Sequence, residues 1–175
     1  MDVAKKSKSK AWIKEFLFVR GMISGPDGSP LYLYHVTDDE YTEIPVVLRR
    51  SIPDIESPVN STYWSAIFCL FVAEKYRREY DGSSLGWSWE GFEKPLSILM
   101  PSWRHSEVVK KGLEFWKRPI RQRTNGHDYL GSLFDEGGLP WRLIQSETHG
   151  FGRAVRGAIL NYYGSLPFRV ESVAS

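Results

Sequence analysis

The chain has 175 residues, of which 42% are hydrophobic and 25% are charged, a balance that is ordinary for one soluble globular domain. Its formal net charge of +2 is too small to indicate nucleic-acid binding by itself, and its single cysteine excludes an internal disulfide. The longest apolar stretch, "WSAIFCLFVA", is about half the length that a membrane span needs, so we expect a cytoplasmic protein without a membrane anchor.

The N-terminal region combines a basic arm, a helix and a turn. Lysines dominate residues 1–10, which predicts a flexible, solvated arm before the fold. The apolar residues of "AWIKEFLFVR" (11–20) have helical spacing, and Gly21 is a plausible stop. After the turn-forming "SGPDGSP", the segment "LYLYHV" (31–36) alternates like a short strand. It can pair with residues 17–24 as a small hairpin.

A short helix and an irregular segment are expected next. Thr37 and Glu40 have the spacing of a capping box, which marks the start of a helix. Pro45 is expected to interrupt this helix, because proline lacks the backbone N–H that a helix interior uses. Two further prolines follow, so residues 45–60 are predicted to be irregular, with at most one helical turn at "VVLRR".

The stretch "NSTYWSAIFCLFVAEKYRREY" predicts the best-defined helix of the chain. Its aromatic and aliphatic residues recur every three or four positions along one broad face. Asn60 or Ser61 can cap its start, and "DGSS" ends it. Cys69 lies inside the apolar run, so we expect a buried and unreactive thiol.

Five shorter helices are expected in the second half. They are predicted from Ser88 onward with a kink or restart at Pro95, and at 106–118, 127–136, 140–147 and 151–163. The pattern as a whole predicts a mainly α fold, an irregular multi-helix bundle of short helices with a possible small N-terminal hairpin. Its expected divisions are a basic arm at 1–10, one helical domain at 11–163 and a C-terminal tail at 164–175.

The glycines of "DEGGLPWRL" invite comparison with a phosphate-binding loop. No strand is expected before them, and Pro140 stands where such a loop needs a lysine. A joint between two packed helices explains the residues better. Gly137 is expected to adopt the left-handed conformation at the helix end, Gly138 gives a second permissive position, and Pro140 starts the next helix.

Aromatic residues make up 14% of the chain, and most of these rings are expected in the core. Some rings are expected to remain at the surface and to bind a partner protein or a neighbouring domain. The tryptophans proposed for this role are Trp87, Trp89, Trp103 and Trp116. A non-catalytic helical interaction module is therefore the leading interpretation.

Nucleic-acid binding is the first alternative. The basic arm and a basic face in the second half could bind phosphates, with Trp103 and Trp116 as stacking surfaces. Its candidate residues are Lys110, Lys111, Arg118, Arg121, Arg123, Arg153 and Arg156. The competing interpretation is a solvated helix surface, because no known nucleic-acid-binding motif is present.

A small hydrolase is the second alternative. Its acid and base groups would be His127, Asp128, Asp135 and Glu136, although the same residues are explained by helix capping and a solvated helix end. The four histidines are widely separated, so we predict neither a metal site nor a cofactor.

Three stretches together resemble a known group of proteins: "PLYLYHVTDDEY", "WSAIFCLFVAEKYRREYDGSSLGWSWEGF" and "YLGSLFDEGGLP". The chain is similar to the N-terminal region of large, uncharacterised bacterial proteins of mobile elements and antiphage defence islands. The shared motifs are aromatic and structural, so the resemblance implies a bacterial, defence-related context and carries over no active site. It also implies that this chain is a fragment, a truncated gene product or a stand-alone version of that module.

Overall fold

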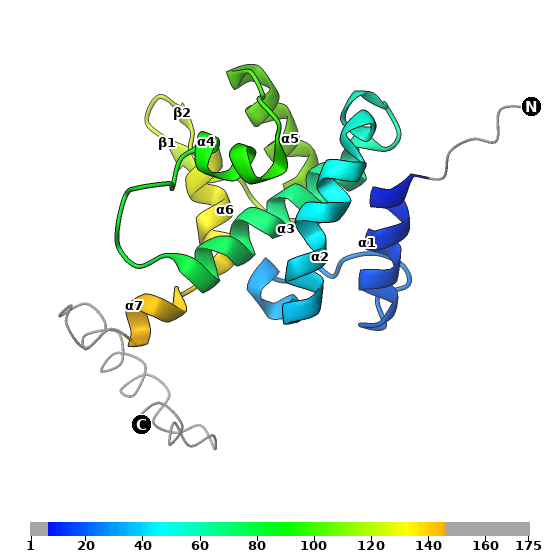
Figure 1. Ribbon diagram of the computed structural model, residues 1–175, viewed down its shortest axis with the longest axis horizontal. Coiled ribbons are helices and arrows are strands. Elements are labelled where there is room, and N and C mark those ends of the chain that lie inside the picture. The colour runs from blue at the N-terminus through cyan, green and yellow to red at the C-terminus, as the bar shows by residue number, and fades with distance from the viewer. Residues whose placement is uncertain (1–6, 146–175) are drawn as a thin grey trace, which may run out of the picture.

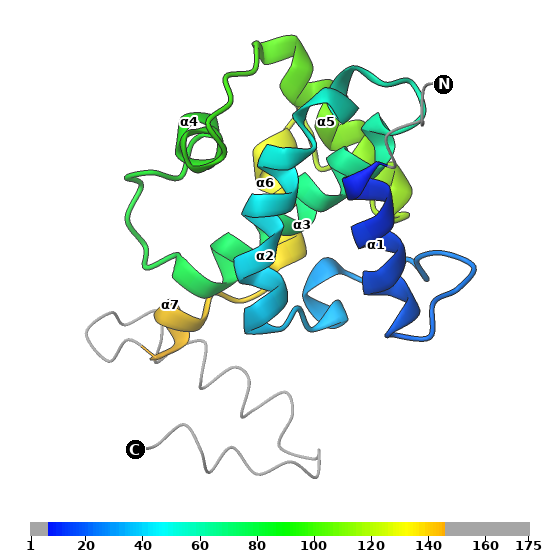
Figure 2. The same cartoon turned by 45° about the vertical axis from the view of Figure 1, so that its right-hand side comes forward.

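The computed structural model describes residues 7–145, which form a mainly α fold around one long central helix (Figures 1 and 2). The α-helices of this part of the chain are α1 (Lys8–Phe18), α2 (Asp38–Arg50), α3 (Ser61–Glu79), α4 (Trp89–Glu93), α5 (Ser102–Phe115), α6 (Tyr129–Gly137) and α7 (Trp141–Gln145). Three 3-10 turns and one short hairpin complete it: η1 (Leu31–Tyr34), η2 (Ile52–Glu56), η3 (Lys94–Leu96), β1 (Gln122–Arg123) and β2 (Gly126–His127). The predicted bundle of short helices is confirmed.

Helix α3 lies at the centre of the bundle (Figure 1). The sequence predicted one broad apolar face, but every residue from Trp64 to Glu74 is buried. Helices α1, α2, α5, α6 and α7 all pack against α3. A helix that is covered on all sides needs small or apolar residues around its whole circumference, which explains the uninterrupted apolar run.

Two glycines allow neighbouring helices to approach α3 closely. A Cβ atom added to Gly112 of α5 would lie 2.6 Å from the carbonyl oxygen of Ser65. One added to Gly137 of α6 would lie 2.5 Å from the carbonyl oxygen of Ala73. The backbones of α5 and α6 therefore contact the backbone of α3, which no other residue type would permit at these positions.

Helix α2 corrects the prediction for residues 45–60. The Thr37–Glu40 capping box is present, with the Thr37 side chain accepting from the Glu40 amide. The helix then continues through Pro45 to Arg50. Proline removes only one hydrogen bond, and the fully buried Ile44 directly before it anchors the helix against the core. Tertiary packing therefore outweighs the cost of an internal proline.

The predicted N-terminal hairpin is wrong. The "LYLY" segment forms the 3-10 turn η1, in which Leu31 and Tyr34 are both buried. The Leu31 amide donates a 3.0 Å hydrogen bond to the buried Glu136 carboxylate of α6, a partner far away in sequence. The described residues have their one hairpin at β1–β2 instead, where Gln122 pairs with His127, within and beside the predicted polar loop "RQRTNG".

The segment between α6 and α7 is a helix joint, as predicted, but the glycine roles differ by one residue. Gly138 adopts the positive φ of 69°, whereas Gly137 is the last residue of α6. Helix α7 begins at Trp141, directly after Pro140. The joint directs α7 back onto the C-terminal end of α3, where the Arg77 guanidinium lies 4.3 Å from the Trp141 ring centroid.

The predicted divisions are adjusted at the N-terminus. Helix α1 already begins at Lys8 within the predicted basic arm, and the Ser7 hydroxyl accepts a hydrogen bond from the Lys10 amide as its cap. The predicted helix at 151–163 and the predicted tail at 164–175 lie outside the described residues.

Candidate docking surface

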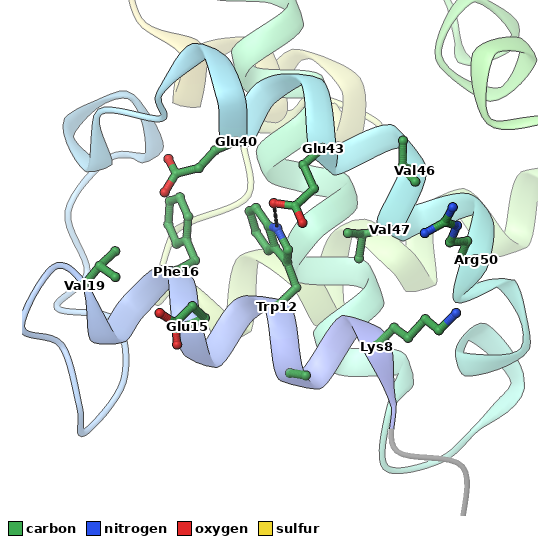
Figure 3. Close-up of a pocket in the computed structure, with 11 residues that line it drawn as sticks. Lys8, Trp12, Glu15, Phe16, Val19, Glu40, Glu43, Val46, Val47 and Arg50 are labelled. Atoms are coloured by element: carbon green, nitrogen blue, oxygen red, sulfur yellow. Dashed lines mark hydrogen bonds between the residues drawn. The ribbon is translucent and has the colours of Figure 1, made fainter.

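A groove of about 580 Å³ lies between α1 and α2 (Figure 3). The rings of Trp12 and Phe16 on α1 line it and stack with centroids 5.2 Å apart, opposite Val47 of α2. The Trp12 indole Nε1 donates a 2.9 Å hydrogen bond across the groove to the Glu43 carboxylate (Figure 3). The groove thus has an apolar lining that remains open to solvent.

Arg20 fixes the end of this groove near the N-terminus of α2. Its guanidinium lies 3.6 Å from the Phe16 ring centroid, donates to the Tyr34 carbonyl at 2.7 Å and pairs with Glu40 at 2.7 Å. Burial opposes ionisation of Glu40, but hydrogen bonds from Arg20 and the Thr37 amide outweigh it and lower the pKa of this carboxyl group. Helix α1, turn η1 and helix α2 are therefore held together by one ionised pair.

A second groove of about 750 Å³ lies on the other side of α1. Tyr63 of α3 and Phe115 of α5 line its far wall. Around the C-terminal end of α1, Phe18 and Val19 are each 61% exposed and Ile23 is 81% exposed. We call the two grooves together with these three apolar side chains the α1 edge. No other helix of the part of the chain that the structure describes covers this edge.

A signal for the α1 edge was present in the sequence and was missed. The run "FLFV" (16–19) places four consecutive apolar residues on one helix end. A helix that packs on one side buries only a stripe of its surface, so four in a row cannot all face the core. Phe16 and Leu17 are buried, and the other two residues of the run are exposed.

The predicted tryptophan cluster is not one surface. Trp116 is fully buried in the core, where its Nε1 donates a 2.9 Å hydrogen bond to the Ala66 carbonyl. Trp87 is half-buried among the rings of α3 and α6, and Trp89 stacks on the His105 ring at 4.3 Å. Trp103 is 60% exposed, so it is the one tryptophan of the four for which the predicted contact with a partner needs no rearrangement of the fold. Trp116 is excluded from partner contact by its burial.

The predicted basic face contains arginines that are already paired with acids. Arg118 donates to the buried Glu136 carboxylate at 2.8 Å. Arg121 and Arg123 at the hairpin lie 3.5 Å and 2.6 Å from the Asp128 carboxylate. Cations that are neutralised by neighbouring carboxylates offer less charge to a phosphate backbone, so these residues are accounted for by the fold.

Of the four remaining basic candidates, two lie on α5 and two lie outside the described residues. Lys111 pairs with Glu107 at 2.8 Å, one turn earlier on the same helix. Lys110 is exposed. Arg153 and Arg156 lie outside the described residues. Nucleic-acid binding by this set stays a prediction.

The four hydrolase candidates occupy different structural roles. His127 is exposed in β2, the Asp128 side chain caps α6, and Asp135 forms an ion pair with Arg121. Burial opposes ionisation of Asp128, but the amide that it caps and the nearby arginines outweigh it and lower its pKa, which is unfavourable for a general acid. Glu136 is buried and faces η1 rather than the other three. The side chains do not converge on a shared pocket.

Two features are absent from residues 7–145. Within this range, no three His, Cys, Asp or Glu side chains come together as a group that could bind a metal ion. None of the helices there combines the length and hydrophobicity that crossing a membrane requires.

Comparison with known proteins places the chain. The family model of the YjiT N-terminal domain matches residues 2–139. Protein YjiT of Escherichia coli (strain K12) is 39% identical over 158 residues, which are 89% of this chain and 30% of that protein. The chain thus spans about a third of the length of this curated relative. No solved structure matches. The expected kinship with the N-terminal region of a longer bacterial protein is confirmed, whereas the defence context stays a prediction. The chain belongs to the YjiT N-terminal domain family.

Proposed function

We propose that this chain is a non-catalytic interaction module that docks a protein partner on the α1 edge. The observation that carries the proposal is the pair of open grooves on either side of α1, bordered by Phe18, Val19 and Ile23. Apolar side chains that gather beside a concave surface are typical of protein-binding sites, whereas isolated exposed ones are ordinary.

The occupant that we propose is a helix from the part of the longer family proteins that lies outside the matched region. The relative from Escherichia coli is more than three times as long as its matched region. Domains of one chain pack through interfaces that resemble those of transient complexes. The α1 edge has the form of such an interface. A bacterial defence role, which the resemblance implies, would be exerted through this partner.

The test is a binding measurement between this chain and the purified remainder of the Escherichia coli relative. Isothermal titration calorimetry should detect a complex, and Val19→Asp should weaken it at least tenfold by placing a charge beside the α1–α2 groove that Val19 lines. The control is Leu99→Asp, which changes a leucine that is 89% exposed outside the α1 edge and should leave affinity unchanged. Absence of a complex with the unmodified chain would overturn the proposal, and so would equal effects of the two substitutions.

A further inference from the structure

The groove between α1 and α2 has opposite charges at its two ends. The helices run antiparallel, so Lys8 at the start of α1 and Arg50 at the end of α2 lie at the same end (Figure 3). Glu15 of α1 lies toward the other end, and Glu43 of α2 lies between that end and Arg50, above Trp12 (Figure 3). Both walls are therefore basic at one end and acidic toward the other.

These four side chains are available to a ligand. All four residues are exposed, and among the described residues none of them forms a salt bridge. Glu43 accepts a hydrogen bond from the Trp12 indole, and no cation within residues 7–145 pairs with its carboxylate. Charges of the same sign on facing walls repel each other across the groove, and a partner of opposite sign would relieve this repulsion.

The stability of α1 itself does not explain its charge order. Acidic residues are favoured at the N-terminus of a helix and basic residues at its C-terminus. Helix α2 follows this rule, with acids in its first turn and Arg49 and Arg50 in its last. Within its own residues helix α1 reverses it, with Lys8 and Lys10 in its first turn and Glu15 in its last, and the cation at its C-terminal end is Arg20, beyond the helix, which donates to the Phe16 carbonyl at 2.9 Å. The reversal gives α1 the same charge direction along the groove as its antiparallel neighbour.

The apolar lining sets the shape of the ligand. Trp12 and Val47 lie in the middle of the groove, and Phe16 lies beside Glu15 toward the acidic end (Figure 3). The 11 residues of α1 span roughly 16 Å at 1.5 Å per residue, which corresponds to about three turns of a second helix. An amphipathic helix with apolar residues three and four positions apart fits a groove of this kind.

We infer that the α1–α2 groove binds an amphipathic helix with oppositely charged ends, oriented with its acidic end at Lys8 and Arg50 and its basic end at Glu15 and Glu43. This inference rests on the proposed docking function and names the chemistry and orientation of the partner. Each exposed ion pair should change affinity about two- to fivefold, and less as salt screens it.

The first experiment compares three synthetic helical peptides of 14 residues with the same leucine stripe. One has two glutamates at its N-terminus and two lysines at its C-terminus, one has glutamates at both ends, and one has lysines at both ends. Titration of the full chain followed by NMR should give the tightest binding for the bipolar peptide. Equal affinities for the three peptides would overturn the inference.

The second experiment reverses one end of the groove. The variant Lys8→Glu/Arg50→Glu should prefer the all-lysine peptide, and the variant Glu15→Lys/Glu43→Lys should prefer the all-glutamate peptide. Circular dichroism checks that each variant folds. An unchanged preference for the bipolar peptide in either folded variant would contradict the assignment of these four residues.

The third experiment reads orientation directly. A nitroxide label at the acidic end of the bipolar peptide should broaden the amide signals around Lys8 and Arg50, and broadening around Glu15 instead would overturn the inference. The outcomes also separate this inference from the proposed function. If the bipolar peptide binds but the remainder of the relative does not, the charged-helix inference stands and only the proposed partner is wrong. Binding of the remainder without any peptide preference would overturn only the charged-helix inference.

Discussion

Replacing Gly112 by alanine should destabilise the fold, because α5 packs directly on the backbone of α3 at this position. The added Cβ would lie 2.6 Å from the Ser65 carbonyl oxygen and would also overlap the Cys69 Sγ. Ordinary contacts of a Cβ begin at about 3.4 Å, so α5 would have to move by about 0.8 Å. A carbonyl of a buried helix cannot rotate away as a side chain can.

Two opposing effects set the size of the change. Alanine favours a helix over glycine by about 1 kcal/mol, whereas overpacking a core costs roughly 1–3 kcal/mol and more when backbone must shift. Because the clash is with backbone and α5 carries the fully buried Trp116 at its end, we expect a net loss of about 2 kcal/mol. For a domain of this size, that lowers the melting temperature by about 4–8 °C.

Urea unfolding followed by tryptophan fluorescence measures this change. The matched control is Lys110→Ala on the exposed side of the same helix, which should alter the free energy of unfolding by less than about 0.5 kcal/mol. In a double-mutant cycle, Cys69→Ala should relieve only part of the loss, because the Ser65 carbonyl remains. A Gly112→Ala protein as stable as the unmodified chain would refute the close-packing argument.

Three further predictions concern α1, a tyrosine and the cysteine. Lys8→Glu should raise the free energy of unfolding by about 0.3–1 kcal/mol, because a glutamate is favoured over a lysine in the first turn of a helix. The same substitution should weaken binding of the bipolar peptide. A loss of stability in thermal melts would contradict the prediction. Burial and the hydrogen bond to Asp27 raise the pKa of Tyr34 to about 12. The contribution of the protonated Tyr34 side chain to the free energy of unfolding is therefore complete below pH 10 and is lost as the pH rises from 10 to 12. Tyr34→Phe should therefore make the melting temperature less sensitive to pH in that window, and an unchanged slope would argue against the assignment. Burial raises the pKa of the Cys69 thiol, so a thiol-specific reagent should modify it only after unfolding; rapid labelling of the native protein would show otherwise.

The sequence predicts helices well where the signals are local. The capping box at Thr37, the existence of α3 and the joint near Pro140 all depend on residues a few positions apart, and all are confirmed. The failures concern distant partners. The "LYLY" segment alternates like a strand, but Leu31 donates to Glu136 and becomes part of a turn. Helix α2 continues past Pro45 because α3 covers its apolar face.

Tryptophan position illustrates why the candidate site could not be predicted from composition. Trp116 and Trp103 lie on the same helix or at its end, yet one is fully buried and the other is 60% exposed. Spacing along one helix gives relative directions, but it does not say which direction the rest of the bundle covers. That information comes from α3, which covers Trp116 through the Ala66 carbonyl and leaves Trp103 outside.

Counting charges misleads for a related reason, because a charge available for binding must be one that the fold does not use. The arginine-rich stretch from Arg118 to Arg123 is conspicuous in the sequence, yet its three arginines pair with acids that hold η1, the hairpin and α6 together. Lys8 and Glu15 are inconspicuous, but they stand in the order that their own helix disfavours. A fold retains a mildly unfavourable arrangement when binding compensates for it. Under the proposed docking function, the partner-binding surface is therefore expected where charge order conflicts with helix stability, at α1, rather than where charge is densest.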